Sequence, residues 1–122
     1  EEAHGFTYDF VFVTRFDNCF CTPLLFNDYS GDCFYSSNWE HPHNIDGFLD
    51  YWFFSDSKMM DKFSNLFDSL DEYLKDGHQL SNHTLSKTHA RRLNFKMDTT
   101  KFEHQDFGLE RCMAGRLEEL CV

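Results

Sequence analysis

Two histidines separated by a single residue form the densest cluster in this sequence of side chains that could bind a metal or take part in catalysis. His41 and His43 flank Pro42, and Glu40 precedes them. On extended backbone the two imidazole rings project to the same side, where they could share a metal ion, while Glu40 could act as a general base. A closed structural metal site needs four ligands. The further histidines that could complete one are spread along polar stretches, at His78, His83, His89 and His104.

Nothing else in the sequence supports an active site. A nucleophile elbow, a phosphate-binding loop, a dinucleotide fingerprint, a zinc-protease helix and a calcium loop are all missing. We therefore predict no catalytic residue, no metal and no cofactor. The enzyme alternative is a ribonuclease-like or other hydrolase site, possibly degenerate, around Glu40, His41 and His43.

The cysteines favour an oxidising compartment and a disulfide-stabilised fold, because five in so short a chain is typical of secreted domains. The number is odd, so one thiol is left over from intramolecular bridges. That thiol could join a second chain, which makes a disulfide-linked dimer or extracellular structural subunit a further alternative. The spacing lacks the Cys-x-x-Cys pattern of redox and zinc sites. The candidates for bridging are Cys19, Cys21, Cys33, Cys112 and Cys121.

Two further features predict a secreted, extracellular glycoprotein. Asn82-His83-Thr84 is an N-glycosylation acceptor that we expect in an exposed loop. The sequence also begins at Glu1 rather than at methionine, as a mature product does after its leader is removed.

The charge restricts the partners. The formal net charge of −10 argues against nucleic acid and anionic membranes, because both require a basic surface. The sequence has no run of about eighteen or more apolar residues, so we expect no membrane insertion. The remaining partner classes are a protein or a small apolar ligand.

Aromatic residues make up 18% of the chain, so rings must supply much of the core. A protein-binding domain would expose some of them as a patch, whereas a ligand-binding domain would enclose a cavity. We therefore predict a secreted binding domain without enzymatic activity, recognising either class of partner. The expected patch is Tyr29, Phe34, Tyr35, Trp39 and Tyr51, and the expected cavity is lined by Phe48, Trp52, Phe63 and Phe67.

The strongest periodic signal is a long amphipathic helix over Ser55–Gly77. Apolar residues recur there at three- and four-residue steps, which places them on one stripe. Asp56 or Ser57 can cap its N-terminus, and Gly77 supplies a left-handed end.

The remaining patterns complete an α+β domain of residues 1–122, with a small antiparallel sheet packed against the long helix and a C-terminal helix. Phe6–Phe16 alternates as a central strand does, and Arg92–Asp98 alternates as a half-buried strand. Residues 47–54 fit a strand or a short helix. Residues 78–89 are polar and irregular, and a helix is expected from Asp106 onward.

One stretch resembles a known family. Residues 8–13, the cysteines that follow, and residues 33–39 are similar to the opening of the secreted S-locus-type acid ribonucleases. In that family a first strand and a cysteine loop precede a catalytic histidine segment. Ser37 stands here in the place of that histidine, and the second histidine segment of the family is missing. The resemblance thus implies a relative that has lost its catalytic histidines.

The cysteine argument gives a direct test. Protein purified without reductant should contain at least one disulfide, because small secreted domains depend on such bonds for stability. Intact-mass measurement under non-reducing conditions should give a lower mass than the reduced chain. Five free thiols in native material would contradict both the compartment and the stabilisation that we predict.

Overall fold

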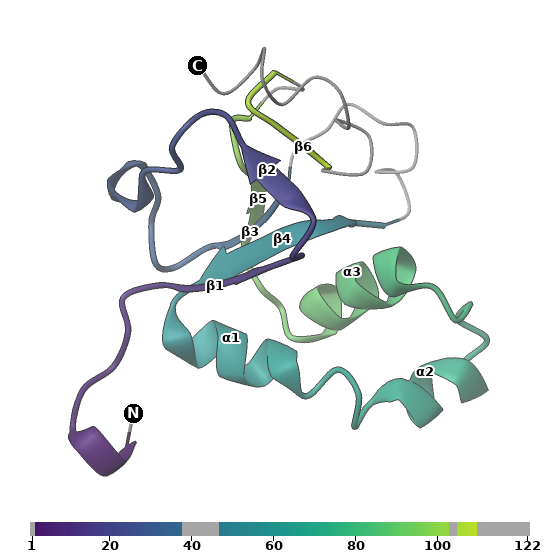
Figure 1. Cartoon of the computed structure of the whole chain (residues 1–122). Helices are drawn as coiled ribbons and strands as arrows, with labels where there is room; N and C mark the ends of the chain where they lie inside the picture. The colour runs from purple at the N-terminus through teal and green to yellow at the C-terminus, as the bar shows by residue number, and fades with distance from the viewer. Residues whose placement is uncertain (1, 38–46, 103–104, 110–122) are drawn as a thin grey trace.

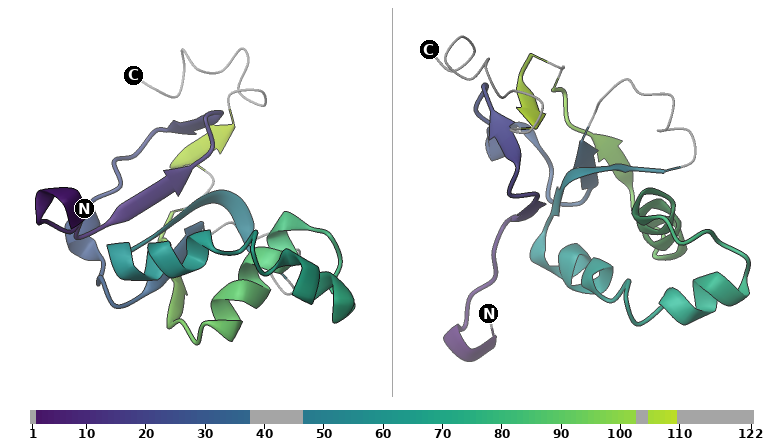
Figure 2. Two further views of the ribbon diagram at one scale, coloured as in Figure 1. Left: turned by 90° about the horizontal axis from the view of Figure 1, so that it is seen from below. Right: turned by 45° about the vertical axis from the view of Figure 1, so that its right-hand side comes forward.

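The structure is a computed structural model, and it describes residues 2–37, 47–102 and 105–109. The chain forms an α+β fold in which helices cover one face of a small mixed sheet (Figure 1). A two-stranded sheet lies on the other side (Figure 2). The described strands are β1 (Val11–Thr14), β2 (Asn18–Phe20), β3 (Phe34–Ser37), β4 (Leu49–Ser55), β5 (Met97–Thr99) and β6 (Phe107–Leu109). The described helices are η1 (Glu2–His4), η2 (Phe26–Asp28), α1 (Ser57–Ser64), α2 (Leu70–Lys75) and α3 (Asn82–Arg92).

The larger sheet has the order β1-β4-β3-β5. Strands β1 and β3 pair antiparallel with β4, whereas β5 pairs parallel with β3. The prediction of a purely antiparallel sheet is therefore wrong. A parallel neighbour requires a long crossover, and here β4 and the three α-helices supply it between β3 and β5. The second sheet pairs β2 antiparallel with β6.

Strand β4 is buried on both faces and separates two aromatic clusters. Trp52 and Phe54 point into the cluster beneath the small sheet, with Tyr35, Phe102 and Phe107. Phe53, from the same strand, points into the cluster beneath the helices, with Phe34, Phe48, Met60, Phe63 and Ala90. Alternate residues of a strand face opposite sides, so one short aromatic run supplies both cores. The cavity expected from Phe48, Trp52, Phe63 and Phe67 does not form, because Trp52 lies across the sheet from Phe48 and Phe63.

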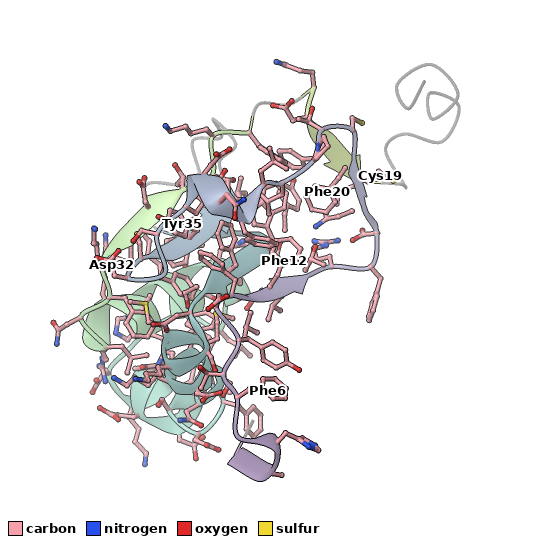
Figure 3. All side chains as sticks on the ribbon, turned by 90° about the vertical axis from the view of Figure 1, so that its left-hand side faces the viewer. Phe6, Phe12, Cys19, Phe20, Asp32 and Tyr35 are labelled. Atoms are coloured by element: carbon pink, nitrogen blue, oxygen red, sulfur yellow. The ribbon has the colours of Figure 1, made fainter. Side chains whose placement is uncertain are left out.

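Rings from outside the central strands extend the first cluster. Figure 3 shows Phe12, Phe20 and Tyr35 above the helices, whereas Phe6 lies lower in the view, on the N-terminal segment. The ring centroids of Phe12 and Phe20 are 6.1 Å apart, and those of Tyr35 and Phe54 are 4.8 Å apart. The aromatic content thus fills the core, as the composition predicts.

The long helix predicted over Ser55–Gly77 is two short helices. Its ends are as predicted: the Asp56 carboxylate accepts a hydrogen bond from the Met59 amide at 2.7 Å, and Gly77 has a φ of 84°. Between α1 and α2, residues 65–69 form successive turns, in which the amides of residues 65, 66, 68 and 69 bond to the carbonyl three residues earlier. Such turns advance about 120° per residue instead of about 100°. Phe67 is therefore rotated away from the stripe that Phe63 begins.

The N-terminal strand is shorter than predicted and lies at the edge. Only Val11–Thr14 pairs, and among the described strands its partner is β4 alone. Phe6 and Tyr8 are exposed outside it. A central strand would be covered on both faces, including Val11 and Val13, but Val13 is 51% exposed.

The polar stretch at residues 78–89 contains most of a helix that the sequence does not predict. Helix α3 buries Leu85, Ser86, His89 and Ala90, only one of which is a large apolar residue. A buried stripe made of polar and small side chains leaves no hydrophobic period to detect. The helix continues through Arg92, so the strand predicted from that residue is confined to β5, whose residues are exposed.

The N-terminus of α3 is held against the start of β4. The Phe48 amide donates to the His83 carbonyl at 3.0 Å, and His83 Nδ1 lies 2.7 Å from the Phe48 carbonyl oxygen. A Cβ atom at Gly47 would lie 2.9 Å from the His83 backbone. This close approach requires glycine.

The predicted C-terminal helix is not observed at its start. Residues 107–109 form strand β6, and its pairing with β2 replaces the helix there. The rest of that prediction lies outside the described residues.

Two neighbouring phenylalanines give a matched test of this fold. Phe63 is 9% exposed and packs on Phe34, whereas Phe67 is 81% exposed. Phe63→Ala should lower the free energy of unfolding by about 3–5 kcal/mol through lost burial and a cavity. Phe67→Ala should change it by less than about 0.5 kcal/mol. Chemical denaturation of both variants measures the two effects, and an equal loss would contradict the break between α1 and α2.

Candidate ligand-binding groove

An apolar hollow opens where the edge of the sheet meets the helices. Its volume is about 640 Å³, and nine of its twelve lining residues are apolar. We call this site the apolar groove. Its lining consists of Val11, Val13, Met60, Phe63, Leu66, Phe67, Leu70, Leu80 and Leu85, with Asp61, Ser64 and Asn82 as the polar members.

Three local features of the chain create the groove. The edge position of β1 gives Val11 and Val13 a neighbouring strand on one side alone, β4, within the described sheet. The tight turns after α1 bring Leu66 and Phe67 to the groove instead of the core. Leu80, in the segment before α3, is 75% exposed. Exposed apolar side chains from three segments thus converge on one hollow.

Most of the polar side chains of the groove already have partners. Ser64 Oγ donates to the backbone carbonyl of Asp61 at 2.7 Å. Asn82 Nδ2 donates to Asp50 at 3.2 Å, and its oxygen accepts from Ser86 at 3.3 Å. These contacts fix the wall of the groove and leave its interior apolar.

A buried histidine joins the three helices behind the groove. His89 of α3 is 3% exposed, and its Nδ1 lies 2.5 Å from the Tyr73 hydroxyl of α2. Its Nε2 lies 3.3 Å from the Lys62 carbonyl of α1, and its ring centroid lies 5.8 Å from that of Phe63, which lines the groove. A neutral ring that accepts from Tyr73 and donates to Lys62 satisfies both nitrogens. Burial lowers the pKa of His89, which favours this neutral form.

Charged side chains lie on the outer side of the contact between His89 and Tyr73. The Arg92 guanidinium lies 4.5 Å from the centre of the Tyr73 ring and pairs with Glu72 and Asp76. These hydrogen bonds, with that of Asp76 the largest contribution, raise the pKa of Arg92. Arg92 thereby ties the end of α3 to α2, and with it the position of Tyr73 over His89.

The residues predicted as an exposed aromatic patch do not form one. Phe34 and Tyr35 are buried, on opposite faces of the sheet. Tyr29 packs on Tyr35 with ring centroids 4.9 Å apart, and Tyr51 packs on Phe107 at 5.4 Å. Trp39 lies outside the described residues. These rings belong to the core or its margin. Phe34, Tyr35 and Tyr51 lie on the central strands β3 and β4, and Tyr29 packs on Tyr35 from the segment after η2.

Tyr29 and Tyr35 do border a second hollow, also of about 640 Å³. Its lining includes Asp28, Asp98 and Lys101, so charged groups of both signs interrupt its surface. It lacks the continuous apolar lining that a small apolar ligand requires, and we therefore place the candidate site in the apolar groove.

The cysteines and the glycosylation site that the sequence predicts lie partly within the described residues. No disulfide is seen among the described residues, which include Cys19, Cys21 and Cys33. Cys33 is buried, and this burial raises the pKa of its thiol, which makes it unreactive near neutral pH. Asn82 is exposed, but it is the first residue of α3 and not part of a loop.

The remaining predictions lie outside the part of the chain that the structure describes. Glu40, His41 and His43 fall there, as do Cys112 and Cys121, so the enzyme and disulfide alternatives stay predictions. Within the described residues, His, Cys, Asp and Glu side chains form no group of three or more suited to a metal. The described helices are also too short and too polar to cross a bilayer.

Comparisons of the chain with protein-family models, with curated proteins and with solved structures found no match. Sequence reasoning identified Phe63 and Phe67 among the residues of the apolar groove, but missed Val13, Leu80 and Leu85.

The buried histidine predicts a dependence of stability on pH. An unfolded histidine takes up a proton near pH about 6.5, whereas the pKa of folded His89 is lower. The stability that the neutral ring contributes is present above pH about 6.5 and is lost as the pH falls toward the folded pKa. The free energy of unfolding should therefore decrease as the pH falls from about 7 through about 6.5 toward the folded pKa.

Two variants separate this effect from general titration. His89→Gln should show a smaller decrease over the same range than the parent chain, because it removes the titrating group. His4→Gln, at an exposed position, should keep the decrease of the parent. Chemical denaturation at each pH measures the three proteins. Equal decreases in His89→Gln and the parent would contradict the assignment.

Proposed function

We propose that this chain is a binding domain, without enzymatic activity of its own, that holds a small apolar ligand in the apolar groove. The observation that carries the proposal is the groove itself: about 640 Å³, with an almost wholly apolar lining. Small-molecule sites typically have volumes of about 300–1,000 Å³, with apolar walls and few polar groups.

The lining gives a driving force for binding. Val13, Phe67 and Leu80 are 51%, 81% and 75% exposed, so water covers much of their surface. Covering apolar surface is favourable by about 25 cal/mol for each Å² removed from water. An apolar ligand would recover this free energy at all three side chains at once, since they border one hollow.

The size of the groove favours a small ligand over a protein partner. A stable protein interface buries about 800 Å² on each side, which would have to include polar surface around the groove. The polar residues beside it, such as Asp61 on α1 and Asn82 on α3, are exposed. A protein partner or a second copy of the chain is therefore an outcome for the test to detect.

The proposal keeps the secreted, extracellular setting inferred from the sequence. The exposed position of Asn82 supports its accessibility to glycosylation. Because Asn82 also lines the groove, a glycan there would border the ligand. The net charge of −10 supports the exclusion of nucleic acid as a partner.

Binding of a neutral apolar probe tests the proposal. The fluorescence of N-phenyl-naphthylamine should rise when it enters the groove. Phe67→Ser should weaken the probe's affinity roughly tenfold, because losing much of one aromatic contact costs about 1.4 kcal/mol. Phe16→Ser is the matched control, since Phe16 is fully exposed and does not line the groove.

The same variants expose the competing explanations. Equal affinities in Phe67→Ser and Phe16→Ser, or no probe binding at all, would contradict the proposal. Sedimentation of the parent as a dimer that Phe67→Ser dissociates would show instead that a second copy covers the groove.

A further inference from the structure

We infer that the groove prefers amphiphiles with a cationic head, such as alkylammonium compounds, over those with an anionic head, and that Asp61 sets this preference. The inference rests on the proposed function, because it concerns the ligand of the same groove. It names the chemical class that the polar end of that ligand should have.

Asp61 is the ionisable member of the groove lining described by the structure. Lysine, arginine and histidine are missing from that set of twelve residues. The two lysines nearest on α1, Lys58 and Lys62, are not part of it, and Lys58 lines a different hollow beside Asp56. Among the residues that line the groove, a charged head group therefore meets one carboxylate and no cationic side chain.

The other polar lining groups are already engaged. The Ser64 hydroxyl donates to a backbone carbonyl, and the Asn82 amide bonds to Asp50 and Ser86. The ion pairs of the described chain use other carboxylates: Asp17 and Asp50 with Arg15, Glu72 and Asp76 with Arg92, and Asp32 with Lys96. Asp61 is exposed at the groove and stands apart from these pairs.

Electrostatics then orders the ligands by charge. An ammonium head near the Asp61 carboxylate is attracted, and a carboxylate head in the same place is repelled. The low-polarity wall beside Asp61 strengthens both effects relative to bulk water. The net charge of −10 adds a weaker bias of the same sign over the whole surface. An uncharged hydroxyl head experiences neither effect and should fall between the two.

Three amphiphiles with the same chain length test the inference: dodecylamine, dodecanol and dodecanoate, with the charged ones below their micelle concentrations and dodecanol below its solubility limit. Displacement of N-phenyl-naphthylamine from the parent chain at neutral pH and low ionic strength gives their affinities. We expect dodecylammonium to bind about tenfold more tightly than dodecanoate, with dodecanol between them. High salt should reduce this ratio.

Two single-charge variants separate the groove from the general acidity of the protein. Asp61→Asn should reduce the ratio to about threefold or less and leave dodecanol unchanged. Asp71→Asn removes one exposed charge from α2 outside the groove, and it should keep the parent ratio.

Each outcome bears on one of the two proposals. Asp61→Asn could bind dodecanol and still have the same ratio of dodecylammonium to dodecanoate affinity as the parent. That result would overturn the role of Asp61 and leave the apolar site intact. If Asp61→Asn and Asp71→Asn reduced the affinity ratio equally, the preference for cationic heads would come from the net charge of the protein. That result would also overturn the inference. Failure of dodecanol to displace the probe would remove the proposed function, and the inference with it.

Discussion

The burial of strand β4 on both of its faces is the constraint on which the rest of the structure depends. Trp52 and Phe54 require a cover on one side, and Phe53 requires a cover on the other. The small β2–β6 sheet covers Trp52, and Phe26 and Tyr29 at η2 cover Phe54. The helices supply the cover on the other side (Figure 1). A strand with bulky rings on consecutive positions cannot lie at a surface, because it presents a large apolar area on both faces.

The apolar groove follows from how the helices meet this sheet. Strand β1 lies at the edge of the described sheet, with β4 on one side alone, and its Val13 stays exposed. Helix α1 stops at Ser64, and the tight turns that follow direct Phe67 outward. The hollow thus lies at the junction of two interruptions, one in the sheet and one in the helical stripe. A ligand bound there would cover apolar side chains that the chain itself leaves exposed.

The third helix is attached differently, through polar groups. His89 bonds to Tyr73 and to the backbone of α1, while His83 and Gly47 join its other end to β4. The His89 contact is buried, and such a contact specifies one arrangement, since a displaced group would lose its hydrogen bond in a dry interior. The wall of the groove that α3 provides is therefore fixed by chemistry that no hydrophobic pattern reveals.

The sequence by itself determined the α+β class, the ring-filled core and the two ends of the helical region at Asp56 and Gly77, because these depend on composition and local capping. Tertiary structure decided the edge position of β1, the parallel pairing of β5 and the turn that exposes Phe67. Helix α3 escaped prediction because its buried face is largely Ser86, His89 and other residues without a hydrophobic period. Burial depends on neighbours distant in sequence, so periodicity could identify an apolar stripe but not which of its members the fold would leave open for a ligand.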